Sequence, residues 1–343
     1  MGKHRQKVGP LLAVAAIAVG VGACGGSGGP TGGPAGAAAI SGELTISGSS
    51  TVEPITSLVA EKFQADNQDV SISVNGPGTT DGFALFCEGK TQISDASREI
   101  EPEEVDACKK AGIDFIELKI GIDGITVLTS PDNDAVDCLD FNDLYALLGP
   151  ESEGFENWSD ANSLGEKLGA SHTPYPDAPL VVTGPGEESG TWGSFIDLAL
   201  KGIGEGRGLD EVTTRPDYQS SPNDNVIIQG IEGSPSSLGW VGFAYYEQTG
   251  GATKAIAIDG GDGCIEPTTQ TIEDRSYPLS RDLYIYVNSK EAESNDAVAA
   301  FVDYYLSDQG LASVQEVGYV SQPDEELAAT QEAWDSRRSG AGS

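Results

Sequence analysis

A repeated order of strand, polar loop and helix constrains the fold of this chain more than any other feature. In residues 43–47 (ELTIS), Leu44 and Ile46 alternate with polar residues, as they do in a strand with one buried face. The loop GSSTVEP follows, and apolar residues then recur at helical spacing from Ile55 to Phe63. This segment therefore predicts one strand-to-helix unit.

Two later segments repeat the pattern. The strand-like VSISV is followed by NGPGTTDG and the helical FALFCEG. The apolar PLVVT is followed by GPGEESGTWGSF, where Trp192, Phe195 and Ile196 share one helical face. Alternating units of this kind predict an α/β protein with helices packed on sheets.

The first residues resemble an export signal. Lys3, Arg5 and Lys7 precede an apolar run that is too short to span a bilayer. The run ends in VGAC, a sequence similar to the bacterial lipobox, in which the cysteine becomes the lipid-modified N-terminus. We therefore expect residues 1–23 to be removed and Cys24 to anchor the protein to the outer face of the cell membrane.

The remaining chain divides by composition. Residues 24–41 are rich in glycine, proline and alanine, which predicts a flexible tether. The chain beyond is long enough for two lobes, and residues 335–343 are expected to form a frayed tail.

The charge of the chain excludes one class of partner. The formal net charge is −35, and removing the three basic residues of the signal takes it to −38. Such a chain has no basic stripe for nucleic acid, so we expect no nucleic-acid partner. A solvated, soluble surface accounts for the acidity.

Four cysteines remain once Cys24 is assigned to the lipid. An even number in an exported chain suggests two disulfides, with three possible pairings. Short separation favours Cys87–Cys108, which leaves Cys138–Cys264. The alternative is a metal site, but the CxxC spacing of zinc sites is absent from the sequence. We expect no metal and no cofactor.

Three polar loops share one design. Each places small hydroxyl residues beside glycine at the start of a predicted helix: Ser49–Thr51, Thr79–Thr80 and Ser189–Thr191. The N–H groups at a helix start bind oxyanions without needing a net positive charge. For any one such loop, ordinary helix capping is the favoured explanation. Three loops that converge would indicate an oxyanion site.

A short polar run, QISDASREI, adds a cation. It contains Ser97 and Arg98, and a guanidinium matches a tetrahedral oxyanion in bidentate geometry. The alternative is a surface ion pair of Arg98 with Glu99 or Glu101.

Five motifs in this order resemble the phosphate-binding proteins of phosphate ABC transporters: GSSTVEPI, GPGTTDGF, DASREI, GPGEESGTW and LGWVGFAYY. The similarity runs from about residue 42 to residue 330. It implies a type II periplasmic-binding-protein fold of two lobes, each a mixed sheet flanked by helices, joined by two hinge strands (ITVLTS and RDLYIYVNS). Lobe I would comprise residues 42–126 and 284–334, and lobe II residues 127–283.

The resemblance also implies a function. A monomer would capture one inorganic phosphate between its lobes and deliver it to the membrane permease of an ABC importer, without being an enzyme. Matched position by position, it implies phosphate-binding roles for Ser50, Thr51, the Val52 backbone, Thr79, Ser189, Gly190 and Thr191.

The chain departs from the best-known members at two positions. Pro185 stands where they have an arginine, and Ser97 stands where they have the aspartate that accepts the phosphate proton. We expect Arg98 to supply the guanidinium. Asp123 or Glu187 would supply the acceptor, although Asp123 also fits an ordinary Asp-Gly turn. An acceptor matters because phosphate keeps a proton near neutral pH and sulfate does not.

Two other functions stay open. A binding protein for sulfate or molybdate would share the fold. A secreted hydrolase could use Ser50 or Ser189 as nucleophile, but it would need a base, and His172 is the only histidine beyond the signal. The sequence does not test a role as an adhesin.

Overall fold

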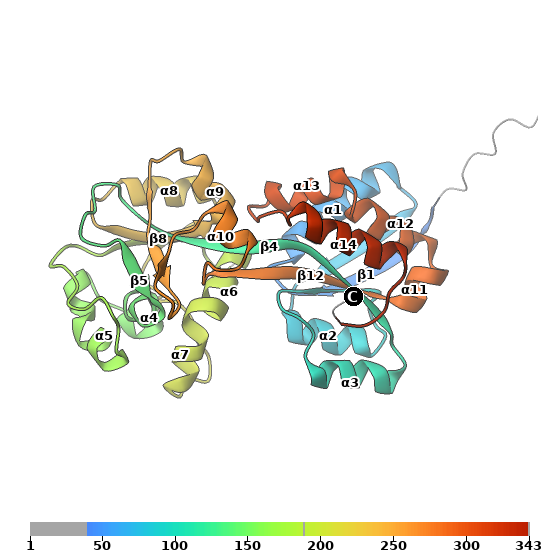
Figure 1. Ribbon diagram of the computed structural model, residues 1–343, viewed down its shortest axis with the longest axis horizontal. Coiled ribbons are helices and arrows are strands. Elements are labelled where there is room, and N and C mark those ends of the chain that lie inside the picture. Colours follow the sequence, from blue (N-terminus) through green and yellow to red (C-terminus); the bar gives the residue numbers. More distant parts are fainter. Residues whose placement is uncertain (1–39, 188, 342–343) are drawn as a thin grey trace, which may run out of the picture. The chain divides into compact units, whose positions relative to one another are not determined.

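The computed structural model describes residues 40–187 and 189–341, which belong to one compact unit of the chain (Figure 1). The predicted signal, Cys24 and nearly all of the predicted tether lie outside the described residues. Within the described part, no helix has the length and apolar character needed to cross a membrane.

A mixed sheet forms the centre of the molecule. Its strands follow the order β2-β1-β3-β12-β4-β8-β6-β7, and β9 pairs with β4. The pairs of β1 with β2 and β3 are parallel, whereas β12 runs antiparallel to both β3 and β4. The strands are β1 (Gly42–Gly48), β2 (Val70–Asn75), β3 (Ile93–Ala96), β4 (Phe115–Thr129), β6 (Val181–Gly184), β7 (Gln219–Ser220), β8 (Ser237–Gly242), β9 (Lys254–Ala255) and β12 (Ser280–Asn288).

A second, smaller sheet has the order β11-β10-β5. Its strands are β5 (Cys138–Asp140), β10 (Ala257–Asp259) and β11 (Cys264–Ile265).

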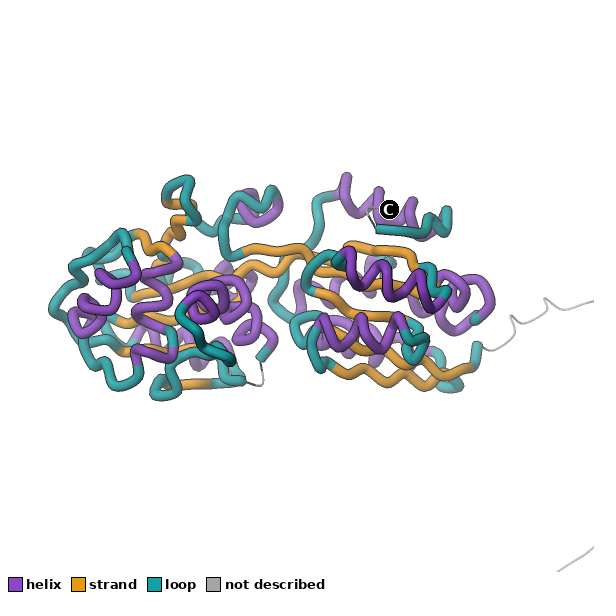
Figure 2. The backbone as a smooth tube through the Cα atoms, turned by 90° about the horizontal axis from the view of Figure 1, so that it is seen from below, coloured by secondary structure: helices purple, strands orange, loops and turns teal. Residues whose placement is uncertain are grey.

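Helices flank the strands in both views of the chain (Figure 2). The α-helices are α1 (Glu53–Asp66), α2 (Thr79–Cys87), α3 (Pro102–Ala111), α4 (Phe141–Leu148), α5 (Asn162–Leu168), α6 (Gly190–Phe195), α7 (Lys201–Gly206), α8 (Asp224–Glu232), α9 (Phe243–Gln248), α10 (Thr269–Glu273), α11 (Ser289–Ser294), α12 (Asp296–Tyr305), α13 (Asp308–Glu316) and α14 (Asp324–Asp335). Two short 3-10 helices, Pro150–Ser152 and Trp158–Ala161, and a π-helical turn, Ile196–Leu200, complete the set.

The three predicted strand-to-helix units are present. Helices α1, α2 and α6 follow β1, β2 and β6, each after a short polar loop. The predicted α/β class is therefore confirmed.

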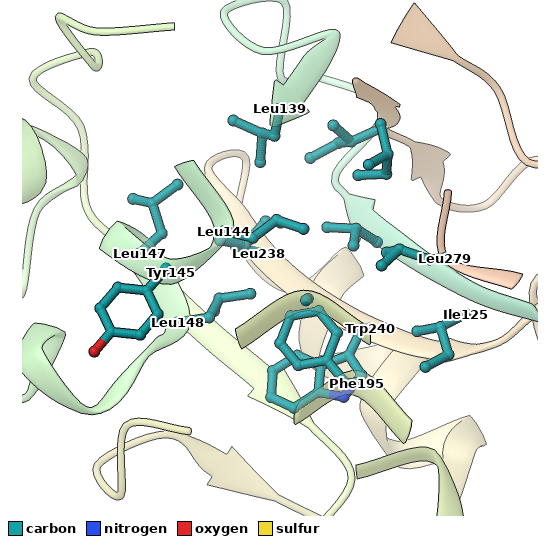
Figure 3. Packing of buried hydrophobic residues seen from close by; sticks show 14 of the residues in the cluster. Ile125, Leu139, Leu144, Tyr145, Leu147, Leu148, Phe195, Leu238, Trp240 and Leu279 are labelled. Carbon is teal, nitrogen blue, oxygen red and sulfur yellow. The ribbon is translucent and has the colours of Figure 1, made fainter. Parts of the chain in front are cut away.

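Two large hydrophobic cores lie along the sheet. One surrounds Leu44 and Phe63, and the other surrounds Phe195 and Trp240, whose rings stack at 4.7 Å between centroids (Figure 3). Strand β4 contributes to both cores, and Leu279, directly before β12, packs in the second core while β12 itself packs in the first. The long antiparallel pairing of β4 with β12 carries the chain from one core to the other, as expected of two hinge strands. The exact lobe boundaries stay a prediction.

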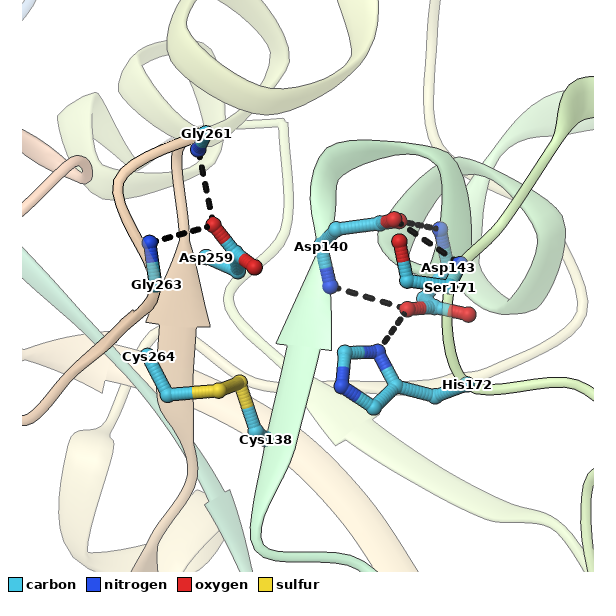
Figure 4. Close-up of a disulfide and its surroundings, with 9 residues drawn as sticks. All are labelled: Cys138, Asp140, Asp143, Ser171, His172, Asp259, Gly261, Gly263 and Cys264. Carbon is cyan, nitrogen blue, oxygen red and sulfur yellow. Dashed lines mark hydrogen bonds and ion pairs between the residues drawn. A yellow bond between two sulfur atoms is a disulfide. The ribbon is translucent and has the colours of Figure 1, made fainter.

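Both predicted disulfides are formed. Cys87–Cys108 joins α2 to α3, and Cys138–Cys264 joins β5 to β11 across the small sheet (Figure 4).

The chain end differs from the prediction of a frayed tail. The N–H of Gly340 donates to the main-chain oxygen of Phe115 at 2.9 Å, and Arg337 lies over the ring of Trp334. Backbone pairing with β4 therefore holds the described residues that follow α14, an interaction that composition does not predict.

Candidate functional site

A polar cavity of about 460 Å³ lies where the first two predicted loops meet the π-helical turn after α6, the start of α7 and β12. Hydroxyl groups and charged side chains dominate its walls. The lining residues are Ser49, Ser50, Thr51, Pro77, Gly78, Thr79, Thr80, Asp81, Ser97, Arg98, Asp197, Lys201 and Arg281.

The first loop is shaped by Ser49. Its Oγ accepts the N–H groups of Thr51 at 3.1 Å and Val52 at 3.4 Å. The backbone donor of Val52 is thus directed to Ser49, and the buried Val52 does not line the cavity. Ser50 and Thr51 do line it, as expected.

The second loop brings two predicted residues together. The Oγ1 of Thr79 lies 3.2 Å from the Oγ of Ser97 and accepts the Ser97 N–H at 3.2 Å. Gly78 precedes the helix with a φ of 116°, a conformation that favours glycine. The start of α2 and the end of β3 therefore form one hydroxyl-lined wall.

The third loop packs directly against the first. Ser189 caps α6, its Oγ accepting the Thr191 N–H at 3.2 Å. A Cβ atom on Gly190 would lie 3.0 Å from the Ser50 main-chain oxygen and from the Thr51 Cα. Glycine is therefore needed for this approach. Loops one and three are neighbours, although Ser189–Thr191 do not line the cavity itself.

Arg98 lines the cavity, and its guanidinium already makes hydrogen bonds to other side chains. Its Nη1 and Nη2 each donate to the Glu104 carboxylate at 2.8 Å, and Nη2 also donates to the Thr80 Oγ1 at 3.1 Å. The hydrogen bonds to Glu104 stabilise the charged form of the Arg98 guanidinium and so raise the pKa of Arg98. The ion pair that the sequence suggested with Glu99 or Glu101 is thus made chiefly with Glu104.

Arg281, which the sequence analysis did not select, is the more buried guanidinium. Its Nη2 donates to the Ser194 Oγ at 2.8 Å and to the Thr51 Oγ1 at 3.1 Å. Its side chain is 15% exposed, against 31% for Arg98. The carboxylate of Asp197 approaches it to 3.4 Å, and Lys201 pairs with Asp197 at 3.6 Å.

Asp123 is the cross-strand partner of Arg281. The register of β4 and β12 aligns the two residues, and the Asp123 Oδ2 lies 3.5 Å from the Arg281 Nε. Asp123 is fully buried, and neither of its oxygens has a hydrogen-bond partner within the described residues. Burial raises the pKa of Asp123, and the charge of Arg281 opposes that rise. The pair is therefore a buried ion pair with unused acceptor capacity.

The signal for this pair was present in the sequence. Arg281 opens the predicted hinge strand RDLYIYVNS, and Asp123 lies two residues before the other hinge strand, ITVLTS. A charge that is buried with such a strand costs free energy unless it has a partner. Residue type could suggest a pair, but only the strand register shows which two charges meet.

Comparisons with known proteins show the family of this chain. The family model for the PBP superfamily domain matches residues 33–309. The chain is 37% identical to the protein SphX of Synechocystis over 83% of this chain and 80% of that one. It is 33% identical to the phosphate-binding protein PstS of Staphylococcus saprophyticus over 92% of this chain and 90% of that one.

The chain belongs to the PstS family of phosphate-binding proteins. A solved structure described as a possible phosphate binding protein from Planctomyces limnophilus has a TM-score of 0.78 and 32% identity, covering 87% of this chain and 99% of that one. An ABC-type phosphate transport receptor from Vibrio cholerae shares the fold, with a TM-score of 0.56 at 22% identity. The predicted family and type II fold are confirmed.

The two departures from the PstS pattern have different surroundings. Pro185 is buried beside an exposed Glu187, whereas Arg98 takes Glu104 as its counter-ion. The geometry thus gives Glu187 no role in holding Arg98. Asp123 and Glu187 were the two predicted acceptors of the phosphate proton. Of these, Asp123 lies beside the cavity, because it contacts Arg281, which lines it.

His172 in this PstS-family chain lies elsewhere. Its Nδ1 is 2.6 Å from the Asp143 Oδ2, beside Asp140 and the Cys138–Cys264 disulfide (Figure 4). Both aspartates already accept main-chain N–H groups as a capping box of α4. No histidine is among the described residues that line the cavity.

Proposed function

We propose that this chain is an extracytoplasmic lipoprotein, anchored through Cys24, that binds inorganic phosphate and delivers it to an ABC-type importer. The observation that carries the proposal is Arg281, a partly buried guanidinium whose Nη2 lies among the hydroxyls of Thr51 and Ser194 at the wall of a polar cavity. The phosphate-binding names of the PstS relatives support the choice of ligand.

In this proposal Arg281 supplies the main positive charge, and Arg98 adds a second from the rim. Guanidinium groups bind tetrahedral oxyanions through paired charge-assisted hydrogen bonds. The hydroxyls of Ser50, Thr51, Thr79 and Ser97 donate to the remaining oxygens. The predicted third loop, Ser189–Thr191, would contribute its donors once the two lobes close on the ligand.

Asp123 is the proposed acceptor of the phosphate proton. Its two oxygens have no hydrogen-bond partner within the described residues, and the charge of Arg281 opposes the rise in the pKa of Asp123 that burial causes. Sulfate carries no proton at neutral pH, so it would leave this carboxylate facing another anion. That unpaired charge is the physical basis for selecting phosphate over sulfate.

Closure is proposed to occur about β4 and β12, between lobe I (residues 42–126 and 284–334) and lobe II (residues 127–283). The ligand-binding pair Arg281 and Asp123 then lies on the hinge strands themselves. A phosphate bound there would contact groups from both lobes, which favours the closed form.

Titration calorimetry on the purified mature chain tests the proposal. Arg281→Met removes two charge-assisted hydrogen bonds of about 1.5–3 kcal/mol each, so we expect phosphate affinity to fall by at least about 100-fold. Arg98→Met, the matched variant at the rim, should weaken binding much less because Glu104 already neutralises that arginine. Equal losses for both variants would remove the special role of Arg281.

Competition distinguishes phosphate from the other oxyanions. We expect a hundredfold excess of sulfate or molybdate to leave phosphate binding nearly unchanged, and Asp123→Asn to reduce that selectivity. Displacement of phosphate by equimolar sulfate from the unaltered protein would instead favour a general oxyanion-binding protein.

The anchor is tested separately. The protein expressed with its full N-terminus should fractionate with membranes, and Cys24→Ser should release it. Membrane association that survives Cys24→Ser would contradict lipidation at that cysteine.

A further inference from the structure

A second buried carboxyl group, Asp95, lies directly behind the first anion loop. It belongs to β3 and aligns with Gly48 at the end of β1. Its main-chain oxygen accepts the N–H of Ser49 at 2.8 Å, so the strand that carries Asp95 also fixes the start of the loop. The proposed ligand-binding scheme makes no use of this carboxyl.

The side chain of Asp95 contacts the helix that the loop begins. The Thr56 Oγ1 donates to the Asp95 Oδ1 at 2.9 Å and lies 3.1 Å from the Tyr305 hydroxyl. Asp95 is fully buried, and its Oδ2 has no hydrogen-bond partner among the residues that the structure describes. A carboxyl in this setting is poorly solvated when it is ionised.

Among the described residues that face the Asp95 carboxyl, none carries a positive charge that would balance its ionised form. Glu53 faces it from the first turn of α1 and Tyr305 from α12, while β1 and β12 place Gly48 and Ile285 beside it. Burial raises the pKa of Asp95 to about 8; the Thr56 hydrogen bond opposes this rise and Glu53 adds to it. Asp95 is therefore neutral at pH 7 and ionises under mildly alkaline conditions.

We propose that Asp95 is a positioning residue of the anion site: its neutral carboxyl supports the Ser49–Val52 loop and the start of α1 in the phosphate-binding form, and its ionised form weakens phosphate binding. This inference rests on the proposed function. Asp95 and the bound anion lie near the same positive helix end, so a charge on one disfavours a charge on the other. The coupling is reciprocal, because bound phosphate must also hold Asp95 in its neutral form.

Phosphate affinity should therefore depend on pH through Asp95. The test compares phosphate dissociation constants of the unaltered protein, Asp95→Asn and Asp66→Asn between about pH 6 and pH 9.5, measured by calorimetry at constant ionic strength. Asp66 is an exposed acid at the far end of the same helix and serves as the matched control. The protonation of phosphate itself affects all three proteins equally and cancels in their ratios.

We expect the ratio of unaltered to Asp95→Asn dissociation constants to be flat up to about pH 7 and to rise about tenfold by pH 9.5. The ratio of unaltered to Asp66→Asn constants should stay flat throughout. Parallel profiles for the unaltered protein and Asp95→Asn would overturn the inference while leaving the proposed function intact. Failure of the unaltered protein to bind phosphate at any pH would overturn both.

A second measurement covers the case in which Asp95→Asn does not fold. Carbon-13 NMR of the Asp95 carboxyl in the unaltered protein should show its titration midpoint about one pH unit higher with saturating phosphate than without. An unchanged midpoint would show that Asp95 and the anion site are not coupled.

Discussion

At the scale of single residues, Asp143 shows how one buried carboxylate organises its surroundings. It accepts the Asp140 N–H at 2.9 Å and the Tyr175 hydroxyl at 2.7 Å, and it contacts the His172 ring. The side chain is fully buried, so removing it leaves several donors without an acceptor.

Asp143→Ala is expected to lower the free energy of unfolding by about 3 kcal/mol. Asp137→Ala is the matched control, because that carboxylate is 82% exposed and pairs only with Lys254 among the described residues. We expect the control to change stability by less than about 0.5 kcal/mol in urea unfolding. Similar losses for both variants would contradict the structural role of Asp143.

Asp95 makes a residue-scale prediction about stability as well as binding. Its pKa in the folded chain is raised to about 8, whereas an unfolded aspartate titrates near its ordinary value of 3.8. Between these values the unfolded chain releases a proton that the folded chain retains. The stability that neutral Asp95 provides is therefore complete below about pH 4 and is lost as the pH rises towards about 8.

The unfolding free energy of the unaltered protein relative to Asp95→Asn should thus fall with rising pH over that window, by up to about 1.4 kcal/mol per pH unit. Every other titratable group contributes equally in the two proteins, so its contribution cancels in the difference between their unfolding free energies. Urea unfolding without phosphate at several pH values provides the measurement. A pH-independent difference would show that Asp95 is not protonated in the folded chain.

At the scale of elements, the start of α2 is fixed by close contact with β1. A Cβ atom on Gly82 would lie 2.4 Å from the Gly48 Cα and 2.9 Å from the Ser47 main-chain oxygen. The absence of a side chain lets α2 approach the strand end that leads into the first loop. This close contact between the backbones of α2 and β1 therefore fixes two walls of the cavity, namely the loop that follows β1 and the start of α2.

Gly82→Ala should destabilise the protein by about 1–3 kcal/mol through overpacking and weaken phosphate binding by shifting Thr79. The matched control is Gly202→Ala in α7, where nothing lies within 4 Å of the added atom. There alanine should be neutral or stabilising by up to about 1 kcal/mol. Thermal melts and calorimetry measure both effects, and equal behaviour of the two variants would exclude the contact as the cause.

At the scale of the whole molecule, the two disulfides constrain loops of very different length. Cys87–Cys108 spans a sequence separation of 21 and Cys138–Cys264 one of 126. Closing a longer loop removes more entropy from the unfolded chain.

Replacing both cysteines of the longer loop by alanine should cost about 5 kcal/mol, against about 3 kcal/mol for the shorter one. Chemical unfolding of the two double variants under identical oxidising conditions gives the comparison. A larger loss from the Cys87–Cys108 pair would mean that local packing, rather than loop length, sets the contribution of these bridges.

The sequence by itself indicated three strand-to-helix units, the family and the favoured disulfide pairing. Those features depend on local periodicity, on motifs read along the chain and on cysteine spacing. It also indicated Ser50, Thr51, Thr79, Ser97 and Arg98, all of which line the cavity.

Tertiary structure alone decided which charges meet. Arg281 and Asp123 are distant in sequence and become neighbours only through the register of β4 and β12. Glu104 is only six residues from Arg98, but the chain must turn into α3 before its carboxylate meets that guanidinium. Burial and strand register set the electrostatics of a site, and neither is a property of a short stretch of sequence.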